Sequence, residues 1–137
     1  MGKGVAEGLR NAKHDIEWFH ERFARESTDD TEWIPIVSAE SMVILTKDLD
    51  IRRVPIEAEA LYDANARCFM FPTKNQNGPS LLLLVANSWA EMEKICATTD
   101  PPFLYRVYGD GTLRRKDTGK AWDRIRAERA TRTAASE

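Results

Sequence analysis

The sequence predicts a layered α/β fold with a mainly parallel central sheet. One observation indicates this class, and a second indicates a single globular domain. Short apolar runs typical of buried strands alternate along the chain with longer segments of helical periodicity. The chain of 137 residues is also 42% hydrophobic and 31% charged, which fits one globular domain whose core needs neither a disulfide nor a metal to fold.

Strand and helix patterns follow one another in a definite order. Apolar runs and alternation predict strands over residues 14–19, 41–46, 67–71, 103–108 and 112–115. Helical spacing predicts helices over residues 3–12, after Asp29, after Pro55, from 81 to about 97 and from 119 to about 131. Gly109, Asp110 and Gly111 predict a hairpin turn between the last two strands.

Local signals place two of these helices. Asp29, with Glu32 three residues later, has the spacing of a capping box, and Pro35 either delays or bends the helix that follows. Ser80 is the expected cap of the long helix. Three large residues fall on predicted inward faces and are expected to be largely buried: Trp33, Leu45 and Leu84.

The clearest strand covers residues 41–46, because its uninterrupted apolar run suits burial on both faces of a parallel sheet. It leads directly into Lys47 and Asp48. Functional sites of open α/β sheets form at the carboxyl ends of strands. We therefore expect any site to lie near residues 46–53.

Carboxylates gather around this point in the sequence. Asp48 and Asp50 follow the strand, while Asp30 and Glu32 stand at the start of the preceding helix, and we expect all four on one rim of the sheet. Clustered carboxylate oxygens suit Mg²⁺ or Mn²⁺, and two such ions support phosphodiester hydrolysis. The alternative is that these residues cap their helices.

Other chemistry-bearing residues give weaker signals. Arg52 and Arg53 either bind phosphate or pair with neighbouring carboxylates. His14 and His20 lack the partner ligands of a metal site and are expected on the surface. Cys68 lies in an apolar strand and is expected to be buried packing. The sequence contains neither a glycine-rich phosphate loop nor a nucleophile elbow.

Charge is distributed unevenly. Residues 1–100 carry 11 Lys and Arg against 17 Asp and Glu, whereas residues 101–137 carry 9 against 5. A basic C-terminal part indicates either a polyanionic partner or a solvated helix. Two cysteines without metal-type spacing, and no apolar run long enough to span a membrane, predict a cytoplasmic protein without a membrane partner.

Three short strings together resemble the PIN-like domains of the PilT N-terminus nuclease superfamily, and among them the VapC-type toxins. The strings are Asp30–Ile34, Met42–Asp48 and Ile51–Arg53. In that family an acidic residue opens a helix, and a hydrophobic strand then ends in Thr-(Arg/Lys)-Asp. The order of the later segments is also similar, so that the resemblance covers about residues 2–115.

The resemblance implies a three-layer α/β/α PIN-like sandwich over residues 1–116, followed by a basic helix or tail over residues 117–137. It also implies an endoribonuclease that uses Mg²⁺ or Mn²⁺ to activate water, with Asp30 and Asp48 as catalytic metal ligands. Asp50 and Glu32 are the less certain metal neighbours. Expected partners are RNA, bound at Arg52 and Arg53, and either an antitoxin protein or a second copy of the chain.

One feature departs from the family. The family normally begins with a strand that ends in Asp, and this strand is not found before the first helix here. Mg²⁺ gives up its water reluctantly and needs several carboxylates. We therefore expect weak metal binding and poor or absent ribonuclease activity. The alternative is a catalytically inactive PIN-like domain that acts as a binding or interaction module.

Overall fold

A four-stranded, mainly parallel sheet forms the centre of the computed structural model, which describes residues 3–12, 30–47, 55–72, 77–116 and 120–136. Its strands lie side by side in chain order: β1 (Val43–Thr46), β2 (Arg67–Met70), β3 (Phe103–Val107) and β4 (Leu113–Arg115). β2 pairs in parallel with β1 and β3, whereas β4 pairs with β3 in antiparallel fashion. The prediction of a mainly parallel sheet is confirmed.

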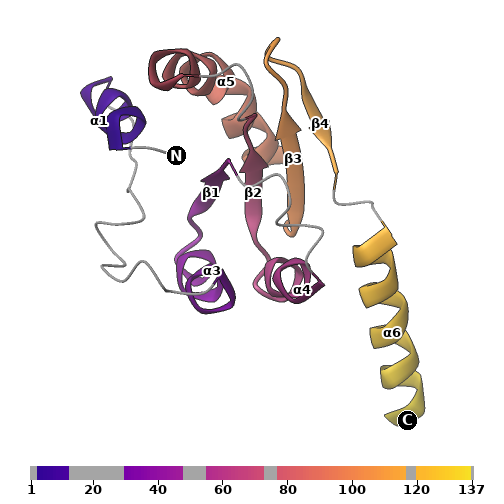
Figure 1. Ribbon diagram of the computed structural model, residues 1–137. Helices are drawn as coiled ribbons and strands as arrows, with labels where there is room; N and C mark the ends of the chain where they lie inside the picture. Colours follow the sequence, from indigo (N-terminus) through magenta and orange to yellow (C-terminus); the bar gives the residue numbers. More distant parts are fainter. Residues whose placement is uncertain (1–2, 13–29, 48–54, 73–76, 117–119, 137) are drawn as a thin grey trace.

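Helices cover the sheet on two sides (Figure 1). One face packs against α1 (Lys3–Asn11) and α5 (Gly78–Thr98), which also contact each other. The other face packs against α3 (Asp30–Ala39), α4 (Pro55–Asp63) and α6 (Lys120–Ser136). The fold is therefore the predicted α/β/α sandwich.

The alternation of side chains along β2 divides the core into two clusters. Cys68 and Met70 point to the α3–α4–α6 side, while Phe69 points to the α1–α5 side, and all three are at most 1% exposed. Successive residues of a strand face opposite sides of the sheet, so a central strand must be apolar throughout. The ring of Phe69 meets that of Phe103 edge to face, with 5.7 Å between centroids.

β1 is less buried than its sequence predicts. Ile44 is 6% exposed, but Val43 is 40% exposed, and Leu45 and Thr46 are only half-buried. Among the described strands β1 has one neighbour, β2, which accounts for the difference. The expected burial of Leu84 is confirmed, whereas Trp33, like Leu45, is half-buried.

The ends of the predicted elements mostly lie within a few residues of the observed ones. The largest differences are the end of α6, which continues to Ser136 instead of ending near residue 131, and the start of α5. Asn77 rather than Ser80 caps α5. The Asn77 side chain accepts a hydrogen bond of 2.9 Å from the backbone N–H of Ser80, and Pro79 occupies the first turn. The predicted strand over residues 14–19, together with His14 and His20, lies outside the described residues.

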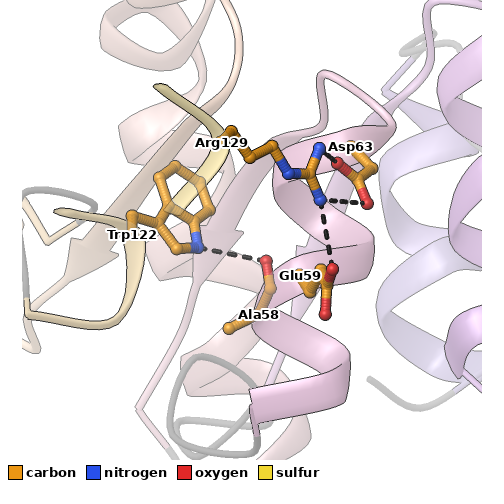
Figure 2. Close-up of polar contacts among 5 residues, drawn as sticks. All are labelled: Ala58, Glu59, Asp63, Trp122 and Arg129. Atoms are coloured by element: carbon orange, nitrogen blue, oxygen red, sulfur yellow. Dashed lines mark hydrogen bonds and ion pairs between the residues drawn. The ribbon is translucent and has the colours of Figure 1, made fainter. Parts of the chain in front are cut away.

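The basic C-terminal helix packs on the sandwich through α4 (Figure 2). The buried indole of Trp122 donates a hydrogen bond of 3.1 Å from Nε1 to the carbonyl of Ala58. About two turns further along the helix, Arg129 pairs with Asp63 and with Glu59, the latter at 3.1 Å. Whether the sandwich ends at residue 116 stays a prediction, but α6 contributes a side chain to its core.

We expect Gly8→Ala to be less favourable for folding than Gly4→Ala. A Cβ at Gly8 would clash with the terminal methyls of Leu82, so Leu82 must change rotamer or α1 and α5 must separate. Overpacking costs about 1–3 kcal/mol, and here the cost should fall at the low end and be partly offset by the helix propensity of alanine, because the methyls end a flexible side chain. Gly4→Ala is the matched control, because a Cβ there meets nothing within 4 Å and alanine favours the helix. Chemical denaturation measures both; equal effects would contradict the close contact.

We expect Trp122→Ala to lower the free energy of unfolding by about 3–5 kcal/mol, since it removes a buried aromatic side chain and its hydrogen bond. Arg129→Ala should have a much smaller effect that shrinks as salt is added, because its ion pairs are exposed to solvent. Denaturant titrations at low and high salt test this. A larger loss of unfolding free energy for Arg129→Ala than for Trp122→Ala would mean that the ion pairs, and not the indole, fix α6 to α4.

Candidate functional site

The carboxyl ends of β1, β2 and β3 meet at one edge of the sheet. Strand register aligns four residues in a row across this edge: Thr46 beside Met70, Met70 beside Arg106, and Arg106 beside Arg114. Register partners share a face, and here it is the face covered by α3 and α4. With strands about 4.8 Å apart, Thr46 and Arg106 lie about 10 Å from each other at the backbone.

Two of the four predicted metal ligands, Asp48 and Asp50, lie outside the described residues. So do Arg52 and Arg53, the residues predicted to bind RNA phosphate. Asp48 is two residues beyond Thr46 in the sequence, a separation that chain geometry limits to about 7 Å. The placement of its carboxylate on the rim stays a prediction.

The acidic residues at the start of α3 are only partly described. The backbone of Asp30 begins α3, while its side chain lies outside the described residues. The side chain of Glu32 is exposed. Their expected meeting with Asp48 at one rim therefore remains a prediction.

The donor atoms of the predicted metal ligands indicate which ion they could hold. No group of three or more His, Cys, Asp or Glu able to hold an ion occurs among the described residues. The four predicted ligands Asp30, Glu32, Asp48 and Asp50 offer only carboxylate oxygens, the donors that Mg²⁺ and Mn²⁺ prefer. The donor set therefore fits such an ion in kind.

The same edge carries basic and aromatic side chains that sequence analysis missed. The guanidinium of Arg106 lies 4.8 Å from the ring centroid of Tyr108, and that of Arg114 lies 5.7 Å from it. The signal was present in the sequence, because the turn after Tyr108 fixes the register that places Arg114 opposite Arg106.

The turn itself is held by local hydrogen bonds. The Asp110 carboxylate accepts a hydrogen bond of 2.9 Å from the backbone N–H of Thr112, and this bond holds the pKa of Asp110 below its ordinary value. Gly111 has a φ of 88°, which a residue with a side chain adopts rarely. This turn therefore keeps Arg106 and Arg114 side by side.

Neither cysteine has the properties of a nucleophile. Cys68 is 0% exposed, as expected for core packing. Burial is the main cause that raises the pKa of the Cys96 thiol, so the thiolate is scarce at neutral pH. Thiol chemistry is therefore disfavoured at both positions.

The sandwich and its acidic motif agree with a comparison against protein families. A model of the PIN-like domain family matches residues 1–73, more than half of the chain. The chain therefore belongs to the PIN-like domain family. Comparisons with curated proteins and with solved structures return no match.

The matched segment contains the motif from Asp30 to Asp48 and the strands β1 and β2. Helices α5 and α6 and the hairpin of β3 and β4 lie beyond it. In the described part of the chain, no helix combines the length and hydropathy needed to cross a membrane. The predicted family is confirmed, and VapC-type specificity stays a prediction.

We expect Cys96 to be alkylated slowly at pH 7 and faster as the pH rises, because its raised pKa keeps the reactive thiolate at a low fraction until higher pH. Cys68 should react only after unfolding. Mass spectrometry after timed iodoacetamide treatment, with free cysteine as reference, measures both rates. Alkylation of Cys96 as fast as free cysteine at pH 7 would contradict the assignment.

Proposed function

We propose that this PIN-like domain is a metal-dependent endoribonuclease whose site lies at the carboxyl edge of the sheet. The observation that carries the proposal is the family match over residues 1–73, which includes the acidic start of α3 and the strand leading to Asp48. Parallel strands ending together at Thr46 and Met70 provide the edge at which such sites form.

In this proposal Asp30 and Asp48 hold a divalent ion, with Asp50 and Glu32 as further neighbours. Bound Mg²⁺ or Mn²⁺ supplies a nucleophile at neutral pH by lowering the pKa of water, and stabilises charge on the phosphate. Arg52 and Arg53 position the RNA backbone through charge-assisted hydrogen bonds. With so few carboxylates, binding of the ion is weak and cleavage is slow.

The finer assignment is to the toxin half of a toxin–antitoxin pair, and the motif resemblance to VapC-type domains supports it. Its partners are then RNA and either an antitoxin protein or a second copy of the chain. The cytoplasm is the compartment that fits an RNA substrate and the two free cysteines.

We expect Asp48→Asn to abolish the slow cleavage of single-stranded RNA measured with Mn²⁺. Mutating residues that merely support a metal ligand costs about 10–100-fold, so losing a ligand should reduce the rate by at least about 100-fold. EDTA should have the same effect on the unmodified chain. Gel analysis of a labelled oligoribonucleotide measures the rate, with Glu91→Gln, an exposed residue of α5, as control.

The outcomes distinguish the two classes of function. Cleavage that survives in Asp48→Asn, or that resists EDTA, would place the reaction elsewhere and overturn the proposal. RNA binding without any Mn²⁺-dependent cleavage would favour the alternative, a catalytically inactive binding or interaction module. Loss of activity in Glu91→Gln as well would point to a general loss of structure.

A further inference from the structure

The β3–β4 hairpin carries a cluster of cations on one face of the sheet. Arg106 and Arg114 are register partners, and both guanidinium groups lie near the ring of Tyr108, at 4.8 and 5.7 Å from its centroid. Residues 103–116 contain four basic residues and a single acidic one, Asp110. We call Arg106, Tyr108 and Arg114 the hairpin cluster.

The positive charge of the hairpin cluster is poorly compensated. Like charges directly opposite each other on neighbouring strands repel. Within the described residues, neither arginine forms an ion pair with a carboxylate. Among the interactions that shift the pKa of Asp110, the one with Arg114 is the smallest. The Nε of Arg106 is buried and has no hydrogen-bond partner there. An anion bound between the two guanidinium groups would relieve both deficits.

The hairpin cluster lies at the edge where the proposed catalytic site is expected. Arg106 stands two strands from Thr46 in the same row and on the same face, and Thr46 precedes Asp48 by two residues. Only two strand spacings, about 10 Å, separate the backbones of Thr46 and Arg106. A strand of RNA entering the site would therefore reach the hairpin.

We propose that the hairpin cluster is an RNA-binding subsite, in which Arg106 and Arg114 hold a phosphate and Tyr108 stacks on a base of single-stranded RNA. Guanidinium groups match phosphate oxygens in a planar, bidentate geometry. An aromatic ring beside them adds stacking, which favours single strands, whose bases are exposed. This inference rests on the proposed RNA substrate, but the subsite lies outside the segment that matches the family.

The test is binding of a fluorescein-labelled single-stranded RNA, followed by anisotropy in EDTA so that no cleavage occurs. We expect Arg114→Gln to weaken binding roughly threefold to tenfold at moderate salt and to reduce the salt slope by about 0.7. Tyr108→Leu should weaken binding at least about fivefold through lost stacking. Thermal denaturation of each variant verifies its fold.

Arg126→Gln is the matched control. It removes the same charge from an arginine that also lies over a tyrosine ring, that of Tyr62, at 5.7 Å, but on α6. Its affinity for RNA should change less than about twofold. An equal loss in Arg126→Gln and Arg114→Gln would overturn the subsite, because net charge alone would then explain binding.

The remaining outcomes separate this inference from the proposed function. Unchanged affinity in Arg114→Gln and Tyr108→Leu would overturn the subsite and leave the cleavage assay on Asp48 untouched. Loss of RNA binding in these variants while the unmodified chain cleaves nothing would support the subsite and overturn the nuclease. Displacement of the RNA by an acidic peptide as readily as by unlabelled RNA would overturn it in favour of a protein partner.

Discussion

The burial of β2 on both of its faces is the constraint on which the rest of the structure depends. Four consecutive residues, Cys68 to Phe71, are at most 1% exposed, so each must find apolar partners on its own side of the sheet. One side requires α1 and α5, and the other requires α3, α4 and α6. The layers, the parallel neighbours and the shared carboxyl edge all follow from a central strand that water does not reach.

Much of this arrangement can be predicted because it depends on residues close together in the sequence. Three signals act within a few residues and predict the observed elements: the apolar stripe of α1, Pro55 at the start of α4 and the glycine turn before β4. The apolar run at residues 41–46 predicts burial of that strand on both faces, whereas β2 is the strand that is buried on both faces. A continuous apolar run does not reveal how many neighbours a strand has, since that depends on chain crossings far away in sequence.

The candidate site also has one part that the sequence predicts and one part that it does not. The acidic motif of Asp30 and Asp48 was recognisable as a string, yet its geometry depends on residues that the structure does not describe. The hairpin cluster went unnoticed because Arg106 and Arg114 are eight residues apart and meet only through strand pairing. Counting residues outward from a hairpin turn identifies which side chains lie opposite each other on the two strands, so such a site can be predicted from the sequence.

The indole of Trp122 on Ala58 has a consequence for how the protein unfolds. It ties the C-terminal helix to α4, which lies inside the family segment, while β3 hydrogen-bonds to β2 from outside it. A fragment ending near residue 73 would leave the backbone of β2 without a partner along one side, and one ending near 116 would uncover apolar surface on α4. The segment that the family shares is therefore shorter than the segment that completes the sheet and the core.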